Sequence, residues 1–459
     1  MMLWKYLKEK LLFSLEQIIC EDERELTYKK VVINAENYAK KLEGVKCCAI
    51  LCKSELSAAC ALLSCFAAGV TAVPMSRRYG ELHCNKIMDM ISPDAIIDDD
   101  GGCLNITKIC DSQYREPQIH PAVIMCTSGT TGTPKGVMLT EKNIMTNVND
   151  ISEYFEICKD DTILISRPLY HCAVLTGEFL VSLVKGVKIR FCSEKLNPAH
   201  LIEIIKKEKI TVFCGTPTIM RFICRLLSNE NAPELHHICI SGECLDKKTG
   251  LKIKEIFSSA HIYHVYGLTE ACPRVSYLPP YLFERHTECV GIPLRNVSIK
   301  ILSEDKKECR HGEIGILHVK GNNVMSGYYN DTETTSDVLQ DGWLCTGDMA
   351  CINDEGLLEI KGRSDDMIIK GGLNIYPGEI EAALKTDCRV KEVLAYGYIT
   401  EYGTCIGIKI AGNFLSLYDV KKLCSECLSE YQIPTHVELV DKLLKNESGK
   451  VVRKIIKRG

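Results

Sequence analysis

The residues with the clearest chemical potential lie between Cys126 and Val137 and read Cys-Thr-Ser-Gly-Thr-Thr-Gly-Thr-Pro-Lys-Gly-Val. Glycines let the backbone turn its N–H groups toward an anion, and the hydroxyls supply further donors. Lys135 adds a positive charge. The run follows an apolar, strand-like segment at 122–125 and precedes a helix that we expect to begin at Glu141. This combination predicts a loop that binds a polyphosphate.

The loop does not match the phosphate loop of P-loop NTPases. That motif needs Gly-Lys followed by Ser or Thr five residues after its first glycine. Here Pro134 stands five residues after Gly129. A surface loop rich in serine, threonine and glycine is the structural alternative, but the density of these residues beside Lys135 favours anion binding.

These residues resemble the phosphate loop of the adenylate-forming superfamily, which comprises acyl- and aryl-CoA synthetases, adenylation domains of peptide synthetases, and luciferases. Further stretches resemble later and earlier motifs of that superfamily, in the same order along nearly the whole chain. They are Phe66–Pro74, Tyr266–Glu270, Gly342–Asp348, Gly362–Gly372 and Asn446–Lys450. The pattern is most similar to that of acyl- and aryl-CoA ligases.

The resemblance implies a reaction in two steps. A carboxylate is joined to the α-phosphate of ATP with release of pyrophosphate, and the acyl-adenylate then passes its acyl group to a thiol. ATP and Mg²⁺ are the implied cofactors, with CoA or a phosphopantetheinyl carrier as co-substrate. Such chemistry requires groups that hold the charge of the triphosphate and of the in-line transition state.

The resemblance also implies which residues bind the nucleotide. We expect Glu270 to bind Mg²⁺, because a hard cation prefers carboxylate oxygen, with Thr131 as a second candidate ligand. Thr269 would donate to the α-phosphate, and Tyr266 would offer its ring to adenine; a helix-capping Glu and a buried core Tyr are the structural alternatives. The expected ATP contacts are Thr127, Ser128, Gly129, Thr130, Thr131, Gly132, Lys135, Gly242, Glu243, Tyr266, Gly267, Thr269, Asp348 and Arg363.

Four of these contacts lie outside the phosphate loop and segment 266–270: Gly242, Glu243, Asp348 and Arg363. Asp348 is expected to accept hydrogen bonds from the ribose hydroxyls, with a turn aspartate before a strand as the competing interpretation. Arg363 resembles a second ribose or phosphate contact. The backbone of 241–245 resembles the segment that lines the adenine pocket in the superfamily.

Lys450 resembles the mobile catalytic lysine of the superfamily, although a solvated lysine in a basic tail is the ordinary alternative. A cation near the carboxylate and the α-phosphate offsets charge that repels the nucleophile. Asp365 matches the hinge about which the C-terminal domain rotates between the two steps. Lys370, Gly371 and Gly372 would then form a loop along which the thiol reaches the site, with a plain hairpin turn as the alternative.

The acid pocket is expected between the helix after His171, segment 214–218 and loop 263–272. His171 is an expected pocket wall or gate, and a core histidine is almost as well supported. Amino-acid-activating relatives carry an Asp near this position, which the chain lacks. We therefore expect an acyl or aryl acid without an α-amino group.

Several functional alternatives stay open. The chain is short for the superfamily, which fits stand-alone enzymes that load an acyl, aryl or amino acid onto a carrier protein. A non-catalytic acyl- or nucleotide-binding homologue, a luciferase-like oxygenase and an ADP-forming phosphotransferase are further readings. Retention of Lys135, Glu270, Asp348 and Lys450 argues against loss of catalysis.

The elements that position these residues have an α/β pattern. Apolar runs such as 47–52 and 162–166 alternate with helical stretches such as 55–68. Short strands and glycine turns dominate after about residue 291, which predicts a small β-barrel or meander. We expect a large domain over residues 1–361, with this β-rich part at about 291–361, and a small mobile α+β domain over 362–459.

Composition excludes several other classes. The 459 residues include 46% hydrophobic ones, so disorder is excluded, and a net charge of −4 gives no reason to expect nucleic acid. No apolar run is long enough to span a membrane, and lysines within 1–17 indicate an amphipathic helix rather than a signal peptide. The 26 cysteines are expected as buried thiols in a reducing, cytoplasmic setting, and the Cys424/Cys427 pair has no partner pair for zinc.

Overall fold

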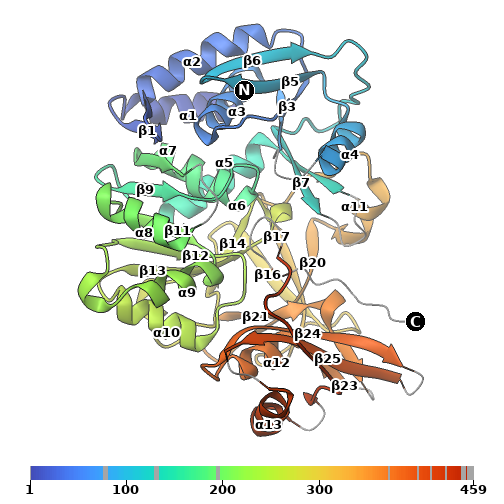
Figure 1. The fold of residues 1–459 in the computed structure, drawn as a ribbon. Helices are drawn as coiled ribbons and strands as arrows, with labels where there is room; N and C mark the ends of the chain where they lie inside the picture. Colours follow the sequence, from blue (N-terminus) through green and yellow to red (C-terminus); the bar gives the residue numbers. More distant parts are fainter. Residues whose placement is uncertain are drawn as a thin grey trace.

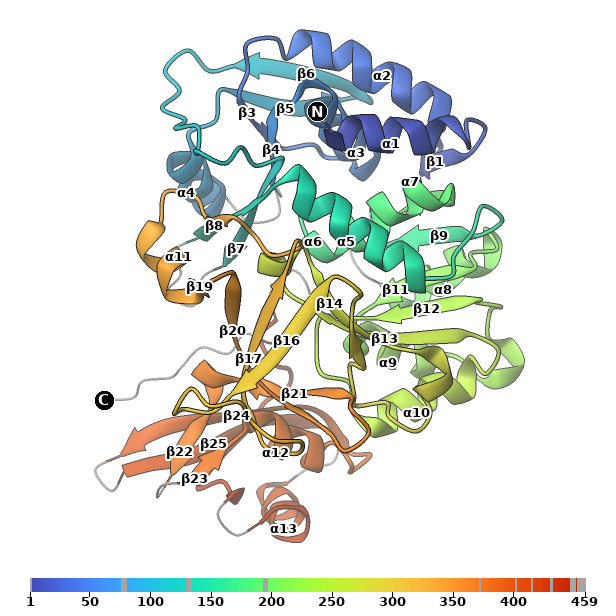
Figure 2. The same cartoon turned by 180° about the vertical axis from the view of Figure 1, so that it is seen from behind.

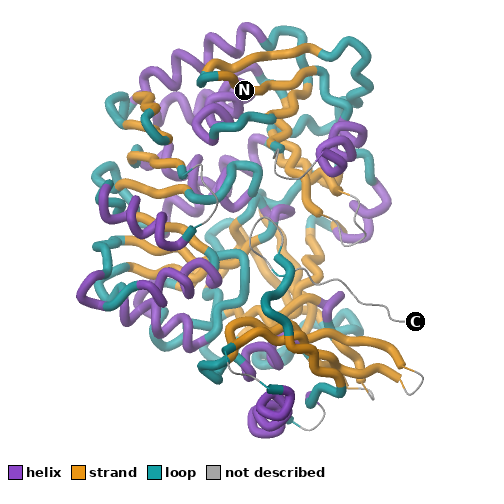
Figure 3. Tube along the Cα trace, viewed as in Figure 1, coloured by secondary structure: helices purple, strands orange, loops and turns teal. Residues whose placement is uncertain are grey.

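The computed structural model describes residues 2–75, 81–128, 134–192, 197–370, 373–400, 403–413, 416–429, 432–445 and 451. Two large sheets, a smaller antiparallel sheet and a C-terminal region of strands and helices follow one another along the molecule (Figure 1). The α/β class predicted from the sequence is confirmed. Helices flank the strands of the two large sheets, whereas strands dominate the rest (Figure 3).

The first large sheet has a parallel centre and antiparallel edges. Its order is β18 (Gly327–Tyr328), β8 (Pro134–Leu139), β7 (Val123–Ser128), β4 (Thr71–Pro74), β3 (Cys47–Ile50), β5 (Ala95–Asp100) and β6 (Cys103–Lys108). The accompanying helices are α1 (Met2–Leu12), α2 (Tyr28–Lys41), α3 (Glu55–Ala68) and α4 (Glu81–Ile91). As predicted, the chain begins with an amphipathic helix: α1 buries Leu3, Trp4, Leu7 and Leu11.

The second large sheet provides the face on which the candidate acid pocket lies. Its order is β15 (Ile292–Pro293), β14 (Arg274–Leu278), β13 (His261–Gly267), β12 (His237–Ile240), β11 (Val212–Gly215), β9 (Thr162–Ile165), β10 (Lys188–Phe191), β1 (Ile18–Glu21) and β2 (Arg24–Thr27). The strands from β13 to β1 are parallel.

Helices cover both faces of this sheet. One face packs against α8 (Pro198–Lys207), α9 (Pro217–Leu226) and α10 (Lys247–Ile256). The other packs against α5 (Glu141–Tyr154), α6 (Cys172–Val174), the π-helical turn Leu175–Leu180 and α7 (Val181–Lys185). This second layer lies between the two large sheets (Figures 1 and 2) and belongs to a core that all three N-terminal sheets share.

The smaller sheet is antiparallel, as the strand-rich pattern after residue 291 predicts. It contains β16 (Val297–Leu302), β17 (Gly315–Gly321), β19 (Leu339–Gln340), β20 (Trp343–Ile352) and β21 (Leu358–Arg363), with α11 (Thr332–Val338) beside it.

The C-terminal region has a hydrophobic core of its own between Ile368 and Leu428. It comprises β22 (Ile368–Lys370), β23 (Leu373–Ile375), α12 (Pro377–Leu384), β24 (Val390–Thr400), β25 (Gly403–Gly412), α13 (Leu417–Cys427) and β26 (His436–Leu439). The pair Cys424 and Cys427 lies in α13, and all 26 cysteines are free.

Local sequence explains where the positioning helices begin. The Thr140 side chain accepts from the backbone of Asn143 in a capping box, which starts α5 directly after β8. Thr216 caps α9 in the same way, and Pro217 occupies its first turn. None of the described helices is long and apolar enough to cross a membrane.

Candidate nucleotide and acid site

A carboxylate, a guanidinium and a phenol from two sheets meet at the predicted ribose position. Asp348 on β20 lies opposite Arg363 on β21, and Arg363 Nη1 is 3.3 Å from Asp348 Oδ1. The hydroxyl of Tyr266, at the end of β13, donates a short hydrogen bond to Asp348 Oδ2. Each carboxylate oxygen therefore holds one partner and keeps a second lone pair, so Asp348 can still accept from a pair of hydroxyls.

Local backbone geometry fixes this corner. Thr346 Oγ1 accepts from the Asp348 N–H at 3.0 Å, and its carbonyl accepts from Arg363 Nη1 at 3.0 Å. Gly347 between them has φ +71°, and a Cβ there would lie 3.1 Å from Arg363 Nη2. A side chain at this position would strain the turn and push the guanidinium away.

Burial dominates the electrostatics of Asp348. The residue is only 8% exposed, and burial raises the pKa of its carboxyl, while Arg363 and the Tyr266 hydroxyl act in the opposite direction. The carboxylate is thus ready to receive donors, because each new hydrogen bond replaces lost hydration.

Tyr328 links strand β8 to Glu270, the predicted magnesium ligand. Glu270 lies in a 3₁₀ turn, Thr269–Ala271, and its Oε1 accepts from Tyr328 Oη at 2.9 Å. The Nζ of Lys135 lies 5.1 Å from the centre of the same Tyr328 ring. Tyr328 therefore lies between the cation expected at the phosphates and the carboxylate expected to bind Mg²⁺. Magnesium usually takes one or two carboxylates together with phosphate oxygens and water, and a single Glu270 fits that pattern.

Two antiparallel strands, β7 and β8, border the predicted phosphate loop. Residues 134–139 form β8, antiparallel to β7, and Thr127 is paired with Lys135. Lys135, which was expected within the phosphate loop, therefore lies on a strand. Thr127 and the backbone of Ser128 lie on β7. Gly129, Thr130, Thr131 and Gly132 lie outside the described residues.

The predicted adenine segment, 241–245, also stabilises the start of helix α9. Gly242 has φ +93°, and Glu243 Oε2 accepts from the N–H of Thr218 at 3.2 Å and from its hydroxyl at 2.6 Å. The carboxylate of Glu243 thus caps the first turn of α9. A Cβ added to Gly267 would lie only 2.2 Å from the backbone oxygen of Pro273, so only glycine fits after Tyr266. The adenine contacts of 242–243 stay a prediction.

The remaining predicted residues lie around these groups. His171 precedes α6, and its ring centre is 4.3 Å from that of Tyr170. Asp365 lies in a 3₁₀ turn after β21, 3.6 Å from Arg363. Lys370 ends β22. Gly371, Gly372 and Lys450 lie outside the described residues, so their roles stay predictions.

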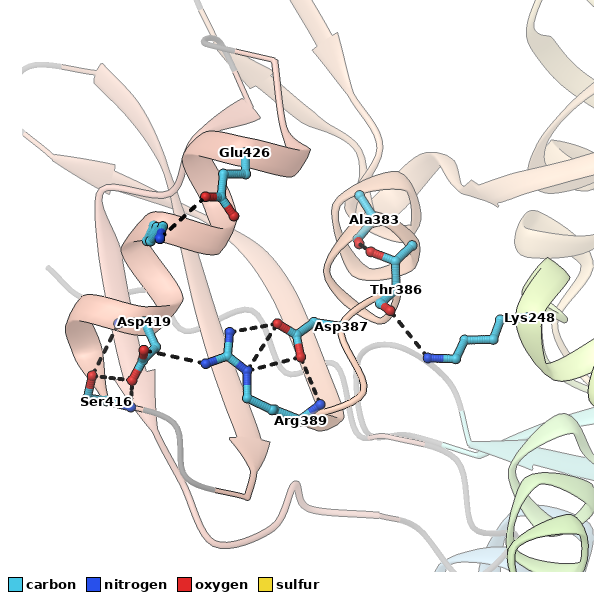
Figure 4. A network of polar contacts seen from close by, with 9 residues as sticks. Lys248, Ala383, Thr386, Asp387, Arg389, Ser416, Asp419 and Glu426 are labelled. Carbon is cyan, nitrogen blue, oxygen red and sulfur yellow. Dashed lines mark hydrogen bonds and ion pairs between the residues drawn. The ribbon is translucent and has the colours of Figure 1, made fainter.

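The C-terminal region meets the large part of the chain at α9 and α10. Lys445 and Val451, on either side of Lys450, form an isolated β-bridge, and Lys445 Nζ lies 5.6 Å from the Phe222 ring centre. They line a cavity of about 170 Å³ between α9 and the C-terminal strands. Lys248 of α10 donates to the carbonyl of Thr386 at 3.3 Å (Figure 4).

Sequence reasoning missed Tyr328 and Thr346. Tyr328 follows Gly327 in an aromatic pair that carries no local sign of a carboxylate partner, since Glu270 is 58 residues away. Thr346 lies inside the Gly342–Asp348 motif, where it could have been noted as a polar residue two positions from Asp348. Within the described ranges, no group of three or more His, Cys, Asp or Glu side chains could hold a metal ion.

Sequence comparison relates the chain to known enzymes. A sequence model of the AMP-binding enzyme family matches residues 13–329. A long-chain-fatty-acid–CoA ligase of Haemophilus influenzae is 31% identical over 369 residues, which cover 75% of this chain and 63% of the relative. An indoleacetate–CoA ligase of Aromatoleum aromaticum is 30% identical over 362 residues, covering 76% and 70%. The match therefore spans less than two thirds of the length of the first relative.

Solved structures share the fold. o-Succinylbenzoate CoA synthetase from Bacillus subtilis, in complex with its acyl-adenylate intermediate, superposes with a TM-score of 0.86 at 24% identity, covering 99% of this chain and 98% of that protein. ATP-bound MatB from Rhodopseudomonas palustris gives 0.85 at 23% identity, covering 97% of both chains.

Proposed function

The chain belongs to the AMP-binding enzyme family, and from that membership and the site geometry we propose that it is an ATP-dependent acid–thiol ligase. It activates a carboxylic acid without an α-amino group as an acyl-adenylate, releases pyrophosphate and transfers the acyl group to CoA. The observation that carries the proposal is the convergence of four motifs distant in sequence: the β7–β8 hairpin, segment 266–270, Asp348 and Arg363.

In the proposed reaction each group has a separate task. Asp348, held by Arg363 and Tyr266, accepts from the ribose and fixes the orientation of the nucleotide. Lys135 and the hairpin backbone bind the phosphates, and Tyr328 orients the Glu270 carboxylate that would hold Mg²⁺. The metal supplies charge neutralisation on the phosphates when bound. Thr269 and Lys450 are assigned to the α-phosphate, where negative charge develops.

The relatives named as CoA ligases support CoA as the acceptor. Loading of a phosphopantetheinyl carrier protein is the alternative acceptor, since both carry the same thiol arm. The C-terminal region from residue 362, with its separate core, is proposed as the part that rotates about Asp365 between the two steps. The Lys248–Thr386 contact is a single exposed hydrogen bond, which is easily broken by such a rotation.

The direct test is acid-dependent exchange of radiolabelled pyrophosphate into ATP across a panel of fatty, short acyl and aryl acids. Exchange should appear with one class of acid and require Mg²⁺, and thioester should form when CoA is added. The same panel with a phosphopantetheinylated carrier protein distinguishes the acceptors. A folded sample that binds ATP yet exchanges with no acid would disprove the proposal.

Substitution of Lys450 separates the two steps. Lys450→Ala should lower adenylate formation by orders of magnitude, because the charge near the α-phosphate is lost, while thioester formation from supplied acyl-adenylate should survive. Lys457→Ala, a neighbour in the same basic tail, is the matched control and should change neither rate. Equal loss of both steps in Lys450→Ala would contradict the rotation of the C-terminal region.

A further inference from the structure

Three charged side chains are buried together between the second large sheet and the π-helical turn. Glu178, in the π-helical turn, is 2% exposed, Arg274 at the start of β14 is 3% exposed, and Arg167, after β9, is 9% exposed. Arg167 Nη2 lies 2.5 Å from Glu178 Oε1. Among the described residues, two guanidinium cations thus share one carboxylate, which leaves one positive charge without a counter-charge.

The unpaired charge belongs to Arg274. Its backbone is clamped on both sides: the N–H donates to Asn147 Oδ1 at 3.1 Å, and the carbonyl accepts from Asn147 at 2.8 Å and from Asn323 at 3.1 Å. A Cβ added to Gly177 would lie 3.0 Å from Arg274 Nη2, so the guanidinium packs against the π-helical turn. Yet among the described residues no atom accepts a hydrogen bond from Arg274 Nε. The side chain is held in place but not satisfied.

The ion pair beside it is also incomplete. Arg167 Nε and Glu178 Oε2 are buried and have no hydrogen-bond partner in the described part of the chain. Burial raises the pKa of Glu178, which shows that Arg167 offsets only part of its lost hydration. Buried polar groups are usually satisfied, and a buried cation without an acceptor is costly. Because the two arginines carry one more positive charge than Glu178 offsets, an anionic ligand would balance the cluster.

The cluster lies beside the ends of two parallel strands of the second large sheet. Arg167 and Ser241 follow the carboxyl ends of parallel strands β9 and β12, and Arg167 Nη2 is 3.4 Å from Ser241 Oγ. Ligands of open α/β sheets bind at these strand ends. Arg274 is four residues after Glu270 and paired with Gly267 across β13 and β14. The three segments expected to enclose the acid therefore border the cluster.

A thiolate of Cys239 is the alternative counter-charge for the buried arginines. Its pKa is lowered to about 7, chiefly by the hydrogen bond with Cys214 and also by Arg274. A thiolate there would be fully buried and would accept only weak hydrogen bonds. A planar anionic oxygen group matches the geometry of a guanidinium far better.

We propose that the acid activated by this protein carries a second anionic group, distal to the carboxylate that is adenylated, and that Arg274, together with Arg167, binds it. The inference rests on the proposed function and names its substrate class. An ammonium group is excluded from the same place, because the surplus charge would repel it. Glu178 acts as a positioning residue that holds Arg167 in place.

The test compares acids that differ only at the far end. Adipate and suberate are assayed against their own monomethyl esters and against hexanoate and octanoate, in pyrophosphate exchange at constant Mg²⁺ and pH. We expect the value of kcat/KM for at least one diacid to exceed that of its monomethyl ester by about tenfold or more, since charge-assisted hydrogen bonds contribute ~1.5–3 kcal/mol.

Substitution at Arg274 should reverse this preference. Arg274→Met keeps the approximate length of the side chain but removes its charge, so the ratio of kcat/KM for the diacid to kcat/KM for its ester should fall by about tenfold or more. Arg190→Met is the matched control, because Arg190 is also buried but is paired with Glu208 at 3.0 Å on β10. That variant loses stability without a change in the ratio.

The outcomes separate this inference from the proposed function. In the wild-type protein, the monoacids could support pyrophosphate exchange as well as or better than every diacid. That result would overturn the proposal of a second anionic group and leave the ligase activity intact. A ratio unchanged in folded Arg274→Met overturns the assignment to Arg274. Absence of exchange with all acids refutes the proposed function itself. If Arg274→Met does not fold, the wild-type panel alone decides.

Discussion

The chain contains two arginine–carboxylate pairs near its candidate site, and they are built in opposite ways. Asp348 and Arg363 face each other across adjacent antiparallel strands, and the Arg363 side chain is 45% exposed. Arg167 and Glu178 are buried between a sheet and a π-helical turn, with 10% and 2% of their side chains exposed. Tyr266 and Thr346 complete the first pair, whereas polar atoms of the second stay unpaired.

The difference indicates how the protein binds the nucleotide and the acid in different ways. The nucleotide end faces a carboxylate whose neighbours already fix its orientation, so the same group serves any ATP. The acid end faces surplus positive charge, which is favourable only when a ligand of the right charge arrives. We therefore interpret the first pair as the common part of the reaction and the second as the part that selects the acid.

The largest effect is expected from breaking the buried pair. Glu178→Gln leaves two buried guanidinium groups without a counter-charge and should lower the free energy of unfolding by about 3–5 kcal/mol. Glu208→Gln, which breaks the pair between buried Arg190 and the more exposed Glu208, should cost only ~1 kcal/mol. Urea unfolding of both variants measures the difference. Equal losses would show that the buried cluster is hydrated.

Breaking the other pair should affect binding rather than folding. Asp348→Asn removes the charged acceptor for the ribose, so kcat/KM for ATP should fall roughly 10- to 100-fold, since hydrogen bonds to a charged group contribute ~1.5–3 kcal/mol. Asp387→Asn breaks a remote aspartate–arginine pair with Arg389 (Figure 4) and serves as the control in the same kinetic assay. A loss in Asp348→Asn no larger than in the control would remove Asp348 from the nucleotide site.

The two regions also differed in how far the sequence could predict them. Asp348, Arg363 and Tyr266 lie in motifs recognisable from a few neighbouring residues, and the structure brings them together. The buried cluster joins residues 11 and 107 positions apart, and an isolated Arg or Glu in an apolar stretch has no local signature of a partner. The helix predicted at 55–68 has these bounds in the structure, where Ser54 caps its start and Gly69 its end.

The phosphate hairpin shows why other features escaped prediction. A strand that begins Pro-Lys-Gly after a glycine- and threonine-rich turn has the local composition of a loop. Its strand character comes from pairing with β7 and β18, which is a tertiary effect. Tyr328 escaped for the same reason, because its role depends on the edge strand β18 lying beside β8.

The pH dependence of stability should report the burial of Asp348. Its pKa is raised in the folded state, so between the ordinary value and the raised one the native protein binds more protons than the unfolded chain. Stability contributed by this group is complete below the ordinary pKa and is lost as pH rises through the raised one. The free energy of unfolding of wild type, relative to Asp348→Asn, should therefore decline across that window. A difference that is constant with pH would contradict the raised pKa.

The smallest effect is expected where a hydroxyl only orients another group. Tyr328→Phe keeps the ring beside Lys135 but removes the hydrogen bond to Glu270, so the KM for Mg·ATP should rise about 3- to 10-fold, matching the ~0.5–1.5 kcal/mol of such a bond. Tyr329→Phe is the control: its hydroxyl accepts from the Arg115 N–H at 3.1 Å, away from the site. Because Glu270 is assigned to Mg²⁺, the defect should shrink as Mg²⁺ is raised, and a defect independent of Mg²⁺ would mean that Tyr328 positions Lys135 instead.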